Sequence, residues 1–117
     1  MDVIGPLQLR VMNYIWEHGA STVHQVHDAL NAAKGAQKLA YTTILTVMRN
    51  LARRAILDQK PAGRSHIFDP LISADDYRRT VLAQVGDDLF DGDLDNLVKY
   101  ISKNKAAIAK AGRGAVA

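Results

Sequence analysis

Apolar side chains in the first third of the chain recur at the spacing of amphipathic helices. Leu7, Val11 and Ile15 share one face of residues 6–18, and Gly19 is suited to end that helix. A proline opens the segment, and proline is favoured in the first turn of a helix. The pattern therefore predicts a first helix over residues 6–18 with one buried stripe.

A second helix is predicted from Thr22 to about residue 32, followed by a loop over residues 35–40. Thr22 and Gln25 have the spacing of a capping box, in which two side chains satisfy each other's backbone N–H groups. The apolar face of this helix consists of Val23, Val26 and Leu30.

The third predicted helix, residues 41–54, has two faces of different chemistry. One face is apolar, with Ile44, Val47, Met48 and Leu51 at helical spacing. The other carries only hydroxyl, amide and guanidinium groups, and no acid occurs in the helix. Exposed helices usually mix both signs of charge, so this face favours an anionic partner. Its members are Thr42, Thr43, Thr46, Arg49, Asn50 and Arg53.

Two strand-like runs, residues 56–60 and 65–69, come after the third helix. The connector over residues 61–64 contains Pro and Gly, which predicts a hairpin with a basic tip that includes Lys60 and Arg64. Three helices followed by a hairpin is the element order of a winged helix, whose third helix enters the major groove of DNA.

The polar residues of the third helix suit DNA recognition. Short threonine side chains reach base edges or a thymine methyl group, and arginines bind phosphates or guanine. Lys60 and Arg64 could reach the backbone from the hairpin, and Tyr41 either caps the helix start or contacts a phosphate. A three-helix core with an incidentally basic surface is the alternative interpretation.

Two further amphipathic helices are predicted after the hairpin. Ser73 and Asp76 cap the first, and residues 91–93 (Asp-Gly-Asp) separate it from the second. From Lys105 the chain has little apolar bulk, so residues 105–117 are expected to form a flexible basic tail. The apolar stripes of the two helices are Tyr77, Val81, Val85 and Leu89, and Leu94, Leu97, Val98 and Ile101.

Composition narrows the class of protein. The chain has 117 residues, of which 48% are apolar and 23% charged, as in a globular domain with a short appendage. No apolar run is long enough for a membrane span, and no secretory signal is visible. There is no cysteine, which excludes disulfides and thiolate chemistry and agrees with the cytoplasm.

Charge is distributed unevenly along the chain. Residues 38–66 carry six Lys or Arg and a single acid, Asp58, whereas residues 73–104 carry four Lys or Arg and seven aspartates. This pattern indicates a module that binds a polyanion joined to a region of other purpose. A solvated basic face is the alternative.

Neither catalysis nor metal binding is indicated. His24 and His27 are three residues apart with His18 nearby, but a zinc site needs three or four ligands. The aspartates of residues 87–95 lack the register of a calcium loop and fit helix caps and a solvated turn. We therefore expect no enzyme activity, no metal site and no cofactor.

Several motifs together resemble the BlaI/MecI/CopY family of penicillinase-type repressors. Residues 39–48 (Leu-Ala-Tyr-Thr-Thr-Ile-Leu-Thr-Val-Met) are similar to the recognition-helix signature of that family. Gly63-Arg64-x-His66-x-Phe68-x-Pro70 is similar to its wing, and residues 89–92 with 96–98 are similar to its dimerisation region.

The resemblance covers about residues 4–104 and implies a mostly α protein with a small β-hairpin wing. It implies a winged-helix DNA-binding domain over residues 1–72 and dimerisation helices over residues 73–104, ahead of the tail at 105–117. The protein would be a homodimeric repressor that binds a pseudo-palindromic operator in double-stranded DNA. Its dimerisation residues would be the two apolar stripes of the C-terminal helices.

The chain departs from the family pattern at several positions. Asn50 stands where the family usually has Arg, and Ala55 where it usually has Gly. Family members that respond to β-lactams are cleaved by a sensor protease at an Asn-Phe bond, and Tyr100-Ile101 occupies that place here. The absence of cysteine removes the copper site of other members. A winged helix that binds proteins, without sequence-specific DNA binding, is the alternative function.

Overall fold

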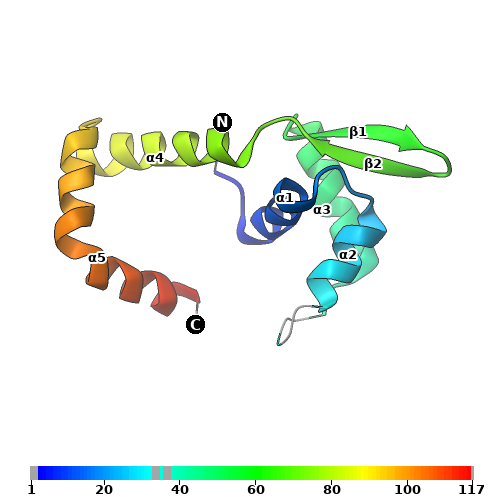
Figure 1. Ribbon diagram of the computed structural model, residues 1–117, viewed down its shortest axis with the longest axis horizontal. Helices are drawn as coiled ribbons and strands as arrows, with labels where there is room; N and C mark the ends of the chain where they lie inside the picture. Colours follow the sequence, from blue (N-terminus) through cyan, green and yellow to red (C-terminus); the bar gives the residue numbers. More distant parts are fainter. Residues whose placement is uncertain (1–2, 33–34, 36–37, 117) are drawn as a thin grey trace. The chain divides into compact units, whose positions relative to one another are not determined.

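The computed structural model describes residues 3–32, 35 and 38–116 of the chain (Figure 1). The chain divides into two compact units, Met1–Tyr77 and Arg78–Ala117. The first unit holds α1 (Pro6–His18), α2 (Val23–Ala32), α3 (Tyr41–Arg53), β1 (Leu57–Ala62) and β2 (Ser65–Pro70). Helix α4 (Ala74–Phe90) starts in the first unit and continues into the second, which also holds α5 (Leu94–Val116). The predicted class, a mostly helical chain with one β-hairpin, is confirmed.

The core of the first unit forms where the apolar stripes of the first three helices meet. The backbone N–H of Gly19 donates to the Ile15 carbonyl over 2.7 Å, and Gly19 has a φ of 85°. Helix α1 therefore ends where the sequence predicts, through a glycine that adopts this conformation without steric cost. The fully buried residues of the three helices are Val11, Met12, Ile15, Val26, Ile44, Met48 and Leu51.

The predicted capping box of α2 is confirmed. The Thr22 N–H donates to Gln25 Oε1 over 2.8 Å, and the Gln25 N–H donates to Thr22 Oγ1 over 3.2 Å. The segment before α3 is fastened to α2 by Asn31, whose side chain accepts from the Leu39 N–H (2.7 Å) and donates to the Leu39 carbonyl (2.9 Å). Residues 36–37 of the loop predicted over 35–40 lie outside the described residues.

The hairpin has a tighter turn than the sequence analysis predicts. Its register runs from Leu57 opposite Pro70 to Ala62 opposite Ser65, so only Gly63 and Arg64 form the loop. The four-residue connector over 61–64 was wrong because Gly63, with a φ of 62°, supplies the first position of a two-residue turn. The proline at position 61 sits within β1, which is tolerated in a two-stranded ribbon with open edges.

One short bridge joins the hairpin to the start of α2. Ser21 and Phe68 form an antiparallel pair, with hydrogen bonds from the Ser21 N–H to Phe68 O (3.1 Å) and from the Phe68 N–H to Ser21 O (2.8 Å). Phe68 is 1% exposed and anchors β2 in the core. The bridge fixes the hairpin relative to α2 and so defines one side of the candidate site.

The expected break between the last two helices is confirmed, but the expected tail is not. Asp91 and Gly92 have positive φ values of 50° and 79°, and Asp93 Oδ1 caps α5 by accepting from the Asn96 N–H over 3.1 Å. Helix α5 then runs to Val116, with non-helical backbone angles only at Asn104. The loss of helical structure expected over residues 105–117 was therefore wrong for residues 105–116, where alanine and lysine are strong helix formers.

Tyr77 also departs from its predicted role. Its hydroxyl accepts a hydrogen bond from the Ile4 N–H over 2.9 Å, and its ring lies 5.6 Å from that of Trp16. Tyr77 is 6% exposed and belongs to the core of the first unit, so it drops out of the predicted dimerisation stripe. Among the described residues, no helix combines the length and apolar character needed to cross a membrane.

Candidate nucleic-acid interface

Helix α3 turns its polar face to solvent because its apolar face is buried. Ile44, Val47, Met48 and Leu51 are at most 9% exposed, which holds the helix against the core. All nine residues proposed from the sequence to bind DNA are exposed; they are Tyr41, Thr42, Thr43, Thr46, Arg49, Asn50, Arg53, Lys60 and Arg64. Exposed donors, acceptors and positive charge therefore lie on α3 and on the hairpin of the first unit.

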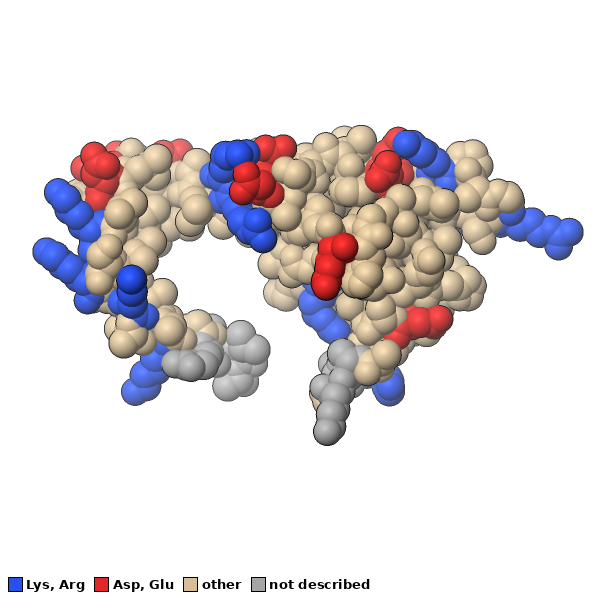
Figure 2. Space-filling view, in the orientation of Figure 1, with Lys and Arg blue, Asp and Glu red and all other residues tan. Residues whose placement is uncertain are grey.

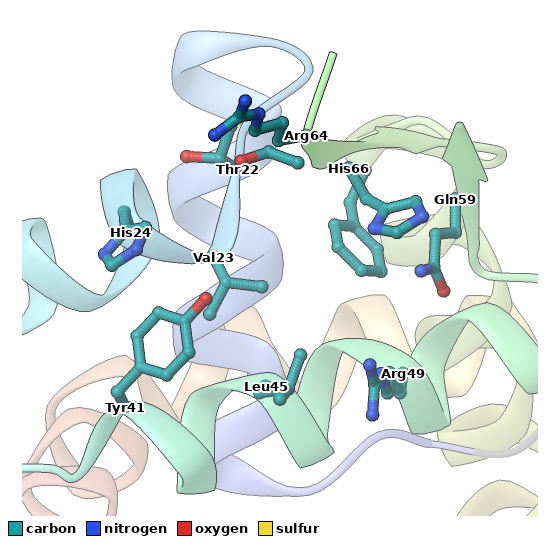
Figure 3. A pocket seen from close by; sticks show the side chains of 11 residues that line it. Thr22, Val23, His24, Tyr41, Leu45, Arg49, Gln59, Arg64 and His66 are labelled. Atoms are coloured by element: carbon teal, nitrogen blue, oxygen red, sulfur yellow. The ribbon is translucent and has the colours of Figure 1, made fainter. Parts of the chain in front are cut away.

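Two stripes of side chains lie outside the buried face of α3. The first consists of Tyr41, Leu45 and Arg49, one helical turn apart, and it faces a pocket between α2, α3 and the hairpin (Figure 3). The second, formed by the remaining polar residues of α3, does not line this pocket; its members are Thr42, Thr43, Thr46, Asn50 and Arg53. We call them the pocket stripe and the outer stripe.

The pocket has a volume of about 310 Å³ and is open to solvent. From α2 and its N-cap come Thr22, Val23 and His24, and the hairpin contributes Gln59, Arg64, Ser65, His66 and Phe68. Figure 3 shows His24 beside Tyr41 on one side and His66 beside Gln59 on the other. The His24 and Tyr41 rings are 4.6 Å apart with a tilt of 37°. None of the lining residues is acidic.

Sequence reasoning missed five polar residues of this pocket. They belong to α2 with its N-cap and to the hairpin, and no pattern within one element shows that they face α3; they are Thr22, His24, Gln59, Ser65 and His66. His66 lies inside the wing motif, so the motif was the one available signal. The bridge between Ser21 and Phe68 holds the hairpin against the start of α2, and this tertiary contact brings these residues to the pocket.

Two of the predicted cations have partners that change their availability. Lys60 Nζ lies 3.7 Å from Asp58 Oδ2 and 3.5 Å from Asp69 Oδ2, so its charge is partly compensated. Arg53 Nη1 donates to Asn50 Oδ1 over 2.8 Å, which orders both side chains along the outer stripe. By contrast, positively charged groups project at the tip of the hairpin in Figure 2, where Arg64 occupies the turn.

His18 of α1 and His27 of α2 make local contacts. His27 Nε2 lies 3.0 Å from the Leu39 carbonyl, and His18 stacks on Tyr14 at 4.2 Å. Within the described part of the chain, no three His, Asp or Glu side chains are grouped to hold a metal ion.

The residues predicted for dimerisation differ in exposure. Leu89, Leu94, Val98 and Ile101 are 72%, 53%, 61% and 38% exposed, whereas Leu97 is only 7% exposed. Val81 and Val85 are half-buried. The second unit therefore carries several large apolar side chains without cover from its own chain, whereas Leu97 is buried.

Three helices, a hairpin and a solvent-facing cationic third helix define a winged-helix domain of the DNA-binding type. Two solved structures share this fold. The solution structure of the DNA-binding domain of the repressor BlaI matches with a TM-score of 0.55 and 27% identity, over 63% of this chain and 87% of that chain. The monomeric form of Bacillus licheniformis BlaI in complex with the blaP half-operator matches with a TM-score of 0.54 and 26% identity, over 65% and 89%.

The sequence comparisons give the family. The model of the penicillinase repressor family matches residues 4–111, so this chain belongs to the penicillinase repressor family. The transcriptional regulator BlaI of Mycobacterium tuberculosis, in two strains, is 36% identical over 74 residues, or 62% of this chain. That match spans about half (51%) of the length of the relative. The resemblance found in the sequence is confirmed, and the family is one of repressors rather than enzymes.

Proposed function

We propose that the chain is a homodimeric transcriptional repressor whose winged helix binds a pseudo-palindromic DNA operator. The observation that carries the proposal is the outer stripe of α3, an exposed surface of hydroxyl, amide and guanidinium groups on a helix anchored by a buried apolar face. The solved relative in complex with a half-operator supports it, because it has the same fold as the first unit. A repressor of this kind works in the cytoplasm, where it blocks transcription at a promoter.

We assign base contacts and backbone contacts to different stripes of α3. Thr42, Thr46 and Asn50 of the outer stripe have short side chains that suit base edges in the major groove. Thr43 lies at the margin of the same face, and Arg53 is long enough to reach a phosphate. Tyr41 and Arg49 point toward the hairpin pocket, where Arg64 also lies, and we assign them to the sugar–phosphate backbone.

Dimerisation is assigned to the second unit. Seven of its large apolar side chains are at least 38% exposed: Leu82, Leu89, Leu94, Val98, Tyr100, Ile101 and Ile108. Apolar surface of this extent on a small unit favours association, and a second copy of the same surface is the simplest cover. Two winged helices held in this way would enter successive major grooves about 34–36 Å apart.

Selection of duplexes from a random-sequence pool by the full chain tests the proposal. The expected result is an enriched site made of two inverted half-sites, with centres about 10–10.5 base pairs or a multiple of this distance apart. A pool that stays random after several rounds would contradict sequence-specific binding and favour the protein-interaction module. An enriched single half-site would retain DNA recognition and contradict the dimer.

A further inference from the structure

The pocket beside α3 contains two histidines that base reading does not use. His24 on α2 and His66 on β2 both line it, together with Arg49 of α3 and Arg64 of the hairpin turn. Their side chains are exposed, so neither imidazole is needed to fill the core. A pocket lined by four basic or ionisable nitrogen groups and no acid is suited to an anion.

The backbone around the pocket holds the two histidines in place. The bridge between Ser21 and Phe68 joins the loop before α2 to β2 through two hydrogen bonds. His24 lies three residues beyond Ser21, and His66 lies two residues before Phe68 and opposite Pro61 in the hairpin. The ring of His24 is further fixed by its contact with Tyr41. The pocket is therefore preformed, which lowers the entropic cost of binding.

We propose that this pocket holds a phosphodiester of the operator backbone, with His24 and His66 as ligands whose protonation makes the DNA affinity rise as the pH falls. The inference rests on the proposed function and adds a binding position and a pH response to it. The location favours a phosphate over a base, because the pocket lies between the start of α2 and the hairpin. Helix N-termini attract phosphates, and the elements around a recognition helix contact the backbone.

The sign of the pH response follows from the groups that face the two imidazoles. The charged and titratable groups that line the pocket beside them are Arg49, Arg64 and Tyr41, and no lining residue is acidic. A phosphate placed among these groups accepts hydrogen bonds from protonated imidazoles. Binding is thus coupled to proton uptake. Because histidine changes charge between about pH 5 and 8, the affinity is higher at pH 6 than at pH 8.

The test measures dissociation constants for the selected operator and a scrambled duplex at pH 6 and pH 8, at constant ionic strength. The full-length wild-type chain is compared with His24→Gln, His66→Gln and the double variant. We expect the wild type to bind both duplexes about three- to tenfold more tightly at pH 6 than at pH 8. The double variant should lose this difference, and at pH 6 its salt slope should fall by about one.

His18→Gln is the matched control, because His18 is also exposed but stacks on Tyr14 and does not line the pocket. It should keep the wild-type pH response. Thermal unfolding of the histidine variants should match the wild type, since both positions are exposed.

A wild type whose affinity is the same at pH 6 and pH 8, or a double variant that keeps the pH response, would overturn the inference and leave the proposed function intact. A wild type that binds no duplex would overturn both this inference and the proposed function. Inorganic phosphate should compete with the operator for this pocket, so the wild type should bind more weakly in phosphate buffer than in an uncharged buffer of equal ionic strength, and the double variant should lose this difference. Inorganic phosphate that stabilises the wild type but not the double variant against heat, and leaves operator affinity unchanged, would assign the pocket to a small free anion and contradict the backbone site.

Discussion

At the scale of single residues, the candidate interface depends on side chains with separate tasks. Arg53 and Asn50 are hydrogen-bonded to one another at 2.8 Å on the outer stripe, and Arg49 faces the hairpin pocket instead. The amide oxygen of Asn50 accepts this hydrogen bond and so orients the Arg53 side chain. Substitutions at these positions should therefore differ in whether they alter sequence preference or total affinity.

Thr46→Ala tests base reading. Thr46 is exposed in the middle of the outer stripe, so its removal should cost about 1–3 kcal/mol on the operator and little on scrambled DNA. Fluorescence anisotropy with the two labelled duplexes measures both values. Equal losses on the two duplexes would remove Thr46 from the base-reading set.

Arg53→Ala tests a phosphate contact. All duplexes should bind more weakly, and the slope of log affinity against log salt should fall by about one, because one counterion fewer is released. The measurement is anisotropy over a series of salt concentrations. A slope equal to that of the wild type would contradict the phosphate assignment. Asn50→Ala is the companion variant, since it removes the acceptor that orders Arg53.

Ala55→Gly tests backbone strain next to the interface. Ala55 is exposed and has a φ of 58°, a left-handed conformation that costs a residue with a Cβ about 1–2 kcal/mol. Glycine avoids this cost but loses more chain entropy, so we expect a net stabilisation of roughly 0.5–1 kcal/mol. Chemical denaturation followed by circular dichroism gives the value. A less stable variant would show that the conformation is not strained.

At the scale of elements, local signals predict the helices better than the hairpin and the chain end. The first helix, the capping box of α2 and the break at Asp91 and Gly92 follow from neighbouring residues, and all are confirmed. The hairpin register depends on one glycine that allows a two-residue turn, which composition does not reveal. The helix beyond Lys105 is not predicted because this segment has too little apolar bulk to show an amphipathic pattern. Its alanines nevertheless favour a helix.

The candidate site shows the same limit. The outer stripe could be predicted because its residues share one helix and one spacing. The pocket could not, because its residues come from α2, α3 and the hairpin, and a tertiary bridge brings them together. Helical spacing assigns Tyr77 to the dimerisation stripe, but its hydroxyl accepts a hydrogen bond from the Ile4 N–H in the core of the first unit.

Val98→Asp tests the apolar surface of the second unit. Val98 is 61% exposed, so a carboxylate is tolerated in the free unit but not in an apolar interface between two copies. Sedimentation should show a shift from dimer to monomer, with helix content unchanged. Asn96→Asp adds the same charge at an exposed polar position of α5 and should leave the dimer intact.

Leu97→Asp should also weaken the dimer, but it tests a different property. Leu97 is 7% exposed within its own chain, so this variant should lose thermal stability together with association. A dimer unaffected by both Val98→Asp and Leu97→Asp would place the interface elsewhere.

At the scale of the whole molecule, two units with different chemistry divide the proposed work. The first combines a winged-helix fold with a basic surface, and the second combines exposed apolar side chains with an acidic turn between its helices. A DNA-binding domain that binds one half-site weakly gains affinity and specificity when two copies bind one symmetric site together. The proposed repressor therefore needs both sequence recognition by the first unit and dimerisation through the second.

Sequence recognition is tested by the affinity of the 117-residue chain for its selected operator compared with its affinity for a scrambled duplex, at several salt concentrations. We expect two chains per operator and a ratio of affinities of about 10³ or more. Affinity for the scrambled duplex should depend steeply on salt, as expected for phosphate contacts alone. Equal affinity for the two duplexes at every salt concentration would show that α3 does not recognise a DNA sequence.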